Sequence, residues 1–342
     1  MKMKLSHCPV LIVICLFLGF SSTGQNLYTA RKDSVKVPRQ PYLRYFTKDG
    51  YGRNITFYLS EVNPGQKLPL VVYIQGSGMG SHFIQQNATI LPANGHIYVQ
   101  ESLQDRARLL IVEKPGVHYL DNPAEGENNR NRKFHQEHSL DRWSEAVKAA
   151  ILATLRSDLA DSNRVLVIGH SEGGLVACKI TSDMKGLVTH VANLAGGGTS
   201  QLFDIISLTR KGNFFSHVSE NPGERVTHVL DEWKKILADP LNTEKYFFGY
   251  SYLRWSSFMK TSCLEQLENC TARIFIAQGM KDEQVDPVSA DQLYAHLLSK
   301  NRQVQYDRLE HADHSFNDNR NPGANGWKAE MEKIMDWFSG SK

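Results

Sequence analysis

The sequence lacks the features that mark disulfide scaffolds, membrane proteins and nucleic-acid binders. Only 5 of its 342 residues are cysteine while 41% are hydrophobic, so a buried core must stabilise the fold. The longest apolar run, Val10 to Phe20, falls well short of the ~20 residues that a membrane-spanning helix needs. The formal net charge is only +3, which gives no electrostatic case for a nucleic-acid partner. The composition is that of a globular protein.

The first 24 residues have the pattern of a secretory signal peptide. Lys2 and Lys4 precede the apolar run, and the small residues Ser22 and Gly24 follow it like a cleavage site. We therefore expect residues 1–24 to be removed, and the mature protein to be secreted or periplasmic without a membrane span. Loss of the two lysines would reduce the net charge to +1.

The cysteines that remain after this leader allow one disulfide. In an oxidising compartment we expect Cys263 to pair with Cys270, because only six residues separate them. Cys178 lies in an apolar helical pattern, where a free thiol usually acts as a small apolar group.

Apolar runs and helical patterns alternate along most of the chain. Two alternating segments, 42–47 and 54–60, predict antiparallel strands after an extended arm at 25–41. Near-continuous apolar runs, typical of buried parallel strands, follow at 70–74, 109–112, 165–168, 188–195 and 273–277. Helical patterns occupy 139–159, which Ser139 can cap, and 173–182, 288–299 and 327–338. This order predicts an α/β fold with a mostly parallel sheet of about eight strands and helices on both faces.

Two segments depart from this alternation. Residues 199–267 contain amphipathic and aromatic pieces but no buried-strand pattern, and we interpret them as a helical cap inserted between core segments 25–198 and 268–342. The basic run Asn128 to Lys133 lies in a stretch rich in Gly and Asn, which favours a solvated loop.

One serine is enclosed by glycines directly after a buried strand. The stretch 165–174 reads VLVIGHSEGG, so Ser171 stands between Gly169 and Gly173, with a helical pattern behind it. A sharp strand-to-helix turn requires small neighbours two residues away on each side, and it pushes the serine oxygen out above the sheet. The spacing matches neither of the common phosphate-binding glycine loops. The motif is that of a nucleophile elbow, and a glycine-rich turn with a bystander serine is the alternative.

From about Tyr42 onward, apart from the cap, the sequence resembles the α/β-hydrolases. In that family an acid and then a histidine follow the serine on later loops. The stretch RIFIAQGMKDEQVDP resembles the family's Gly-x-x-Asp-x-x-Val pattern, which implies Asp282 as the acid, whereas Asp286 is placed to cap the next helix. The stretch HADHSF implies His314 as the base.

The other histidines have weaker claims to that role. His311 is expected to be a loop or supporting residue, and His170 to be a packed neighbour of the serine. His311 and His314 lack a third ligand nearby, so we predict no metal and no other cofactor.

The resemblance also implies two backbone N–H donors for an oxyanion. One belongs to Glu172, the residue after the serine, and the other to the loop after VVYIQG, with Ser77 as donor and Gly78 beside it. In the cap, Tyr250, Tyr252 and Trp255 are candidates for binding substrate, although aromatic residues at this spacing also suit a cap core.

These features predict a monomeric serine hydrolase that acts on a small-molecule ester or peptide through Ser171, His314 and Asp282. The resemblance is shared with carboxylesterases and with peptidases similar to the prolyl oligopeptidase family. Only residues 25–69 of the expected mature chain precede LVVYIQG, too few for the propeller that such peptidases usually carry, which favours an esterase. A noncatalytic binding protein on a hydrolase scaffold is a further alternative.

Overall fold

The computed structural model describes residues 28–63, 65–120 and 128–340. The expected signal peptide therefore lies outside the described residues. Within the described part of the chain, no helix combines the length and the apolar content that crossing a bilayer would require.

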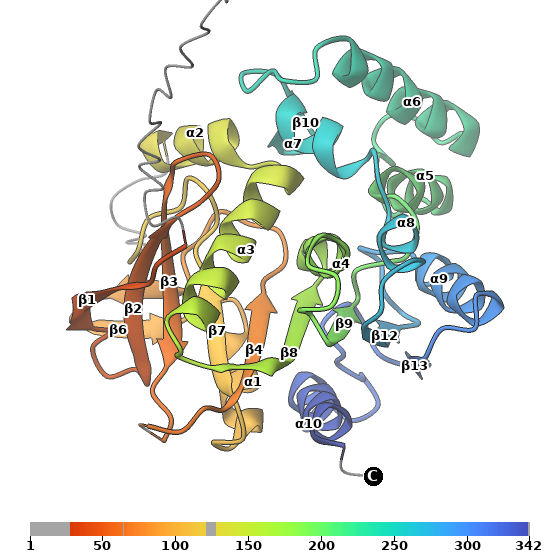
Figure 1. Ribbon diagram of the computed structural model, residues 1–342. Coiled ribbons are helices and arrows are strands. Elements are labelled where there is room, and N and C mark those ends of the chain that lie inside the picture. Colours follow the sequence, from red (N-terminus) through yellow and green to blue (C-terminus); the bar gives the residue numbers. More distant parts are fainter. Residues whose placement is uncertain (1–27, 64, 121–127, 341–342) are drawn as a thin grey trace, which may run out of the picture.

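A nine-stranded sheet forms the centre of the fold (Figure 1). Its spatial order is β1-β2-β3-β7-β4-β8-β9-β12-β13. The strands are β1 Arg31–Lys36, β2 Tyr42–Lys48, β3 Asn54–Ser60, β7 Arg108–Val112, β4 Pro69–Ile74, β8 Asp161–His170, β9 His190–Leu194, β12 Arg273–Gly279 and β13 Val304–Leu309. Pairing is antiparallel from β1 to β7 and parallel from β7 to β13. The predicted mostly parallel sheet is thus confirmed.

Helices cover both faces of the sheet because its central strands are apolar on both sides. On one face, Leu70 and Val72 of β4 point into a core with α3, α4, α8 and α9. On the other face, Val71 and Tyr73 join a core with α1 and α10. These helices are α1 His96–Leu103, α3 Leu140–Arg156, α4 Glu172–Asp183, α8 Cys263–Leu267, α9 Pro287–Ser299 and α10 Gly326–Ser339. Ser139 caps α3 as expected, because its hydroxyl accepts a hydrogen bond from the Arg142 N–H at 3.3 Å.

The segment between β9 and β12 is largely helical, and most of it lies beyond one end of the sheet (Figure 1). It contains α5 Gln201–Lys211, α6 Pro222–Ala238, β10 Tyr246–Phe247, β11 Tyr250–Ser251, α7 Tyr252–Phe258 and α8. Ile205, Val229 and Trp255 belong to a hydrophobic cluster of its own. We refer to residues 199–267 as the cap segment.

Several local expectations were wrong or incomplete. Part of the expected N-terminal arm forms β1, an edge strand paired with β2. The basic run that we expected to be a loop lies in α2, Asn128–Glu137, and Phe134 of the same helix is buried. A short hairpin of β5 Phe83–Gln86 and β6 Thr89–Pro92 was not anticipated.

The expected disulfide between Cys263 and Cys270 is not formed, and the described cysteines are buried free thiols. Cys263 begins α8 and lies against Cys178 of α4, where its sulfur accepts from Asn193 Nδ2 at 3.6 Å. The Cys270 sulfur lies beyond the end of α8, 3.4 Å from Arg302 Nη2. The short helix thus directs the two thiols to different partners. The expectation of a buried free thiol at Cys178 is confirmed.

Candidate active site

The predicted functional residues follow four strands of the parallel part of the sheet, at its carboxyl edge. Ser77 follows β4, Ser171 follows β8, Asp282 follows β12 and His314 follows β13. Because these strands are parallel, their carboxyl ends lie at the same edge. Residues up to 237 positions apart in the chain are therefore brought to one site.

Ser171 occupies a sharp turn between β8 and α4, with φ 55° and ψ −125°. This conformation is unfavourable for a residue with a Cβ atom, and it is held by a 2.8 Å hydrogen bond from the Ser171 N–H to the Leu194 carbonyl. A Cβ atom on Gly173 would lie 2.4 Å from the carbonyl oxygens of Ile74 and Gln75, and one on Gly169 would lie 2.1 Å from the Gly173 oxygen. The two glycines are thus required for the close packing of strand, turn and helix.

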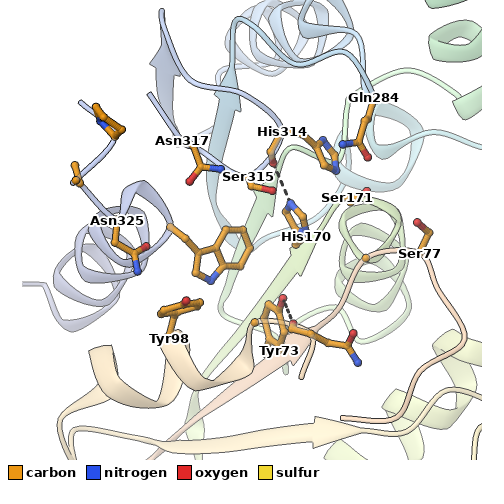
Figure 2. Close-up of a pocket in the computed structure, with 17 residues that line it drawn as sticks. Tyr73, Ser77, Tyr98, His170, Ser171, Gln284, His314, Ser315, Asn317 and Asn325 are labelled. Carbon is orange, nitrogen blue, oxygen red and sulfur yellow. Dashed lines mark hydrogen bonds between the residues drawn. The ribbon is translucent and has the colours of Figure 1, made fainter. Parts of the chain in front are cut away.

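His314 and Asp282 are joined by a 2.8 Å hydrogen bond between Nδ1 and Oδ2. Both side chains are buried, and the backbone N–H groups of Gln284 and Val285 donate to Asp282 Oδ1 at 2.8 and 3.0 Å. Gln278 Nε2 donates to the Oδ2 atom at 2.9 Å. These donors hold the carboxyl group in place, and the carboxyl group in turn fixes the imidazole ring. Ser171 and His314 line the same cavity (Figure 2).

The rival candidates have other roles in the structure. Asp286 caps α9 by accepting from the Val288 N–H at 3.1 Å, and it forms an ion pair with Lys211 at 2.8 Å. His311 is exposed. His170 packs edge-on against Trp327, and its Nε2 lies 3.2 Å from the His314 carbonyl oxygen. Burial lowers the pKa of His170 to about 4, with a further contribution from His314, so this ring is neutral at pH 7.

The loop that carries Ser77 is fixed by a buried lysine. Lys114 Nζ donates to the carbonyl oxygens of Gly76 and Gly78 at 2.6 and 2.9 Å, and lies 4.3 Å from the centre of the Trp143 ring. Burial lowers the pKa of Lys114 to about 8, opposed by the nearby Glu172 carboxylate. The expected donor loop is thus tied to the interior on both sides of Ser77.

The side chain of Glu172 points into the protein and forms a charged cluster. Its carboxylate accepts from His138 Nε2 at 2.7 Å and from Arg254 Nε at 3.1 Å, and it also contacts Arg254 Nη2. Burial alone would raise the pKa of Glu172, but Arg254, His138 and Lys114 hold it well below its usual range. Arg254 comes from α7, so this cluster links the cap segment to the residue beside Ser171.

Two cavities meet at Ser171. The larger, of about 680 Å³, extends beneath the loop before α10, and Figure 2 shows Tyr98 and Asn325 on the side away from Ser171. The smaller, of about 300 Å³, lies under the cap segment. Both are lined by Ser77, Ser171 and Gln284.

Of the cap residues proposed from the sequence to bind substrate, two line the smaller cavity and one lies in the interior of the cap segment. Tyr250 and Trp255 line the smaller cavity, together with Glu172. Tyr252 is instead buried in the hydrophobic cluster of the cap segment. Gly78 has φ +117°, a conformation that favours glycine, and its carbonyl oxygen is one of the two held by Lys114.

Sequence reasoning missed Lys114, His138 and Arg254. Lys114 lies in the loop after β7, His138 lies just before α3, and Arg254 lies in α7. Only the tertiary structure brings these three residues together. A lysine directly after the apolar run at 109–112 was the one available signal, because a charge there must be paired or hydrogen-bonded if buried. His138 and Arg254 gave no comparable signal.

The sheet order and the strand–serine–helix turn define the class of the protein: it is a serine hydrolase with the α/β-hydrolase fold. A family model described as "Putative esterase" matches residues 50–338, and the chain belongs to this family. A search of curated protein sequences finds no match.

Solved structures share this fold at low sequence identity. Est1E from Butyrivibrio proteoclasticus is 13% identical, with 87% of this chain and 99% of that chain covered and a TM-score of 0.53. A Mycobacterium tuberculosis puromycin-hydrolyzing peptidase is 15% identical, with 94% and 41% covered and a TM-score of 0.56. The Pyrococcus horikoshii acylaminoacyl peptidase is 13% identical, with 91% of this chain and 41% of that chain covered and a TM-score of 0.57. The chain thus spans about two fifths of the length of these two peptidases.

Proposed function

We propose that the protein hydrolyses a carboxylic ester by acyl transfer, with Ser171 as nucleophile, His314 as general base and acid, and Asp282 as the orienting carboxylate. The observation that carries this proposal is the 2.8 Å hydrogen bond between His314 Nδ1 and Asp282, beside a serine held at positive φ on the same cavity. With Nδ1–H donated to Asp282, His314 Nε2 is the nitrogen that can accept a proton.

In the proposed reaction, Ser171 Oγ attacks the ester carbonyl carbon as its proton passes to His314 Nε2. The tetrahedral oxyanion accepts hydrogen bonds from the backbone N–H groups of Glu172 and Ser77. The C–O bond to the alcohol then breaks, and the imidazolium gives its proton to the leaving oxygen. Water, activated by His314, hydrolyses the acyl-enzyme and releases the acid.

The charges around Ser171 favour an ester over a peptide with a free N-terminus. A substrate α-ammonium group requires an accessible carboxylate or several backbone acceptors. Among the described lining residues, the carboxyl groups are Glu172, which is paired with Arg254, and Asp204, whose pKa burial raises well above its usual range. The Glu172 charge is thus neutralised within the protein, and burial disfavours the charged form of Asp204.

Labelling and a substrate panel test this function. We expect a fluorophosphonate probe to label the protein but not Ser171→Ala, and p-nitrophenyl acetate to be hydrolysed faster than aminoacyl-nitroanilides. Ser77→Ala is the matched control, because it keeps the backbone N–H and should still be labelled. Labelling that survives in Ser171→Ala would contradict the assignment of the nucleophile. Faster turnover of the nitroanilides would make the peptidase the better description.

We also propose that residues 1–24 direct export, on the basis of their basic, apolar and small-residue pattern. Expression of the full chain in a bacterium should give a shortened protein outside the cytoplasm, as measured by intact mass after fractionation. Full-length protein confined to the cytoplasm would contradict this expectation.

A further inference from the structure

One peptide group in the loop after β4 connects the protein interior with the candidate active site. Its carbonyl oxygen belongs to Gly76 and accepts from Lys114 Nζ at 2.6 Å, and its N–H belongs to Ser77, a proposed oxyanion donor. The C=O and N–H of a trans peptide group point in opposite directions. Because the Gly76 carbonyl is held towards the buried Lys114, the Ser77 N–H is turned away from it, and Ser77 lines both cavities.

This peptide group also lies beside the proposed nucleophile. A Cβ atom on Gly76 would lie 3.1 Å from Ser171 Cβ. Lys114 Nζ holds a second carbonyl oxygen, that of Gly78, at 2.9 Å. One ammonium group therefore fixes the backbone before and after Ser77, and a rotation of the Gly76–Ser77 peptide would misdirect the N–H.

The positive charge of Lys114 has a direct effect on that N–H. A neutral side-chain amide could also donate to two carbonyl groups, and it would cost less to bury than an ammonium group. A hydrogen bond from a charged donor is stronger, and hydrogen bonds in a chain polarise one another. An ammonium group on the Gly76 oxygen therefore strengthens the hydrogen bond that the Ser77 N–H can give.

The surroundings of Lys114 let this charge change near neutral pH. The titratable and charged groups that face it are Glu172 of α4, Arg254 of α7, His138 before α3, His82 in the chain after β4, and the adjacent Glu113. Burial lowers the pKa of His138 to about 4 and that of His82 well below its usual range, so both rings are neutral at pH 7. Burial also lowers the pKa of Lys114, to about 8, although Glu172 opposes this shift.

We propose that Lys114 is a positioning residue for ester hydrolysis: its ammonium group holds the Gly76–Ser77 peptide so that the Ser77 N–H is directed at the oxyanion and polarised for it. This inference rests on the proposed function and deepens it. Among the described residues that line the two cavities, Lys114 does not appear, so it acts through the peptide group and not on the substrate.

Replacement of Lys114 by methionine gives the first test. Lys114→Met keeps a long apolar side chain and removes both the charge and the hydrogen-bond donors. For p-nitrophenyl acetate at pH 7.5, kcat and kcat/KM should fall by the same factor, about 30-fold, because the lost interaction is made only in the transition state.

Arg225→Met is the matched control. Arg225 is another buried cation that holds backbone, because it donates to the carbonyl oxygens of Thr209, Ser219 and Glu220 at 3.1, 2.8 and 3.0 Å. It is not among the described residues that line either cavity. Arg225→Met should therefore lose stability in urea unfolding and retain its kcat.

The pH profile separates the charge of Lys114 from its packing. In the unmodified enzyme, kcat should fall to a lower plateau as the pH rises through about 8, because the neutral amine is a weaker donor. Lys114→Gln keeps an NH₂ donor that has no proton to lose in this range. Its kcat should be reduced and should stay constant from about pH 7.5 to about pH 9.5. Lys114→Gln also carries the test if Lys114→Met does not fold.

A ketone that mimics the tetrahedral intermediate gives an independent measurement. Ser171 Oγ adds to the carbonyl carbon of trifluoroacetophenone, its proton passes to His314, and the C=O electron pair becomes the oxyanion. The inhibition constant should rise about 30-fold in Lys114→Met, in step with the loss of kcat/KM. The inhibition constant of acetophenone, which remains a ketone when bound, should not change.

The outcomes separate failure of this inference from failure of the esterase function. Unchanged kcat and unchanged affinity for trifluoroacetophenone in a folded Lys114 variant would overturn the inference. An alkaline fall in kcat that persists in Lys114→Gln would also overturn it, as would an equal loss of kcat in Arg225→Met. In all of these cases the unmodified enzyme still cleaves esters. Absence of ester cleavage and of fluorophosphonate labelling in the unmodified protein would instead reject the proposed function.

Discussion

The carboxyl edge of the sheet and the cap segment hold their residues in the site by different means. At the edge, Ser171 is fixed by a backbone hydrogen bond and by glycine packing, and Asp282 by three hydrogen-bond donors besides His314. In the cap segment, the aromatic residues pack largely against one another. The comparison teaches that groups needing sub-ångström placement are held by the sheet, whereas side chains that shape a cavity need only a common hydrophobic cluster.

The largest expected effect is at the sheet edge. His314→Asn removes the group that accepts and returns the proton, and kcat for ester hydrolysis should fall by ~10⁴-fold or more. His311→Asn, an exposed histidine three residues away, is the control and should retain activity. Steady-state kinetics with p-nitrophenyl acetate measures both variants. A fall of less than tenfold in His314→Asn would mean that another group acts as base.

The link between the two regions is the next test. Arg254→Met leaves the buried Glu172 carboxylate without its main cationic partner, so the free energy of unfolding should fall by about 3 kcal/mol. The Glu172 N–H, which we propose as an oxyanion donor, adjoins this carboxylate, so kcat should fall more than KM changes. In the double variant Arg254→Met with Glu172→Gln, part of the lost stability should return because no buried charge is left unpaired. Urea unfolding at pH 7 measures the stability of each variant. A double variant less stable than Arg254→Met would contradict the expectation that the unpaired charge causes the loss.

Acid should destabilise the hydrolase core through buried neutral imidazoles. Burial lowers the pKa values of His96, His138 and His170 to about 4 each. Between pH 6.5 and 4 the unfolded chain therefore binds more protons than the folded one, and stability falls as the pH is lowered through this window. The lowered pKa of Glu172 acts in the same direction below about pH 4.5.

Urea midpoints measured between pH 7 and pH 4 test this expectation. His170→Asn should show a shallower decline than the unmodified protein, and His311→Gln, which alters an exposed ring, should show the same decline. A constant midpoint across this range would contradict the buried neutral imidazoles.

The smallest effect concerns backbone strain at the edge. Ser171→Gly removes the Cβ atom from a residue at φ 55°, and should raise the free energy of unfolding by about 1 kcal/mol while it abolishes hydrolysis. Ser77→Gly is a control on the opposite loop, where no such gain is expected. A loss of stability in Ser171→Gly, measured by thermal unfolding, would show that the turn is not strained.

The difference between the sheet edge and the cap segment also explains how much of the structure the sequence could predict. The core strands, the four main helices and the turn at Ser171 follow from local patterns: apolar runs, a capping serine and paired glycines. The Asp282–His314 contact was anticipated through family resemblance, and the structure has the two side chains hydrogen-bonded at 2.8 Å. These features depend on short segments whose physical requirements are visible in one stretch of chain.

Features that depend on distant segments were not predictable. Lys114 reaches Gly76 and Gly78 from the end of the neighbouring strand β7, and Arg254 reaches Glu172 from the cap segment. The six-residue spacing of Cys263 and Cys270 suggested a bond that helix geometry does not form. In α2, burial of Phe134 accompanies a helix that the basic residues alone did not indicate. Tyr252 and Trp255 have similar sequence surroundings, yet only Trp255 lines the smaller cavity at Ser171.

The entry and exit of the cap segment lie next to each other. Ser200 pairs with Ser262 in an isolated bridge, and the Leu264 N–H donates to the Gly198 carbonyl at 2.9 Å. The strands on either side, β9 and β12, are hydrogen-bonded neighbours. A contiguous stretch of gene therefore encodes the cap segment, and its replacement would leave β9 and β12 paired as neighbours. A replacement would reshape the smaller cavity, and it would also have to supply a cation for Glu172 in place of Arg254.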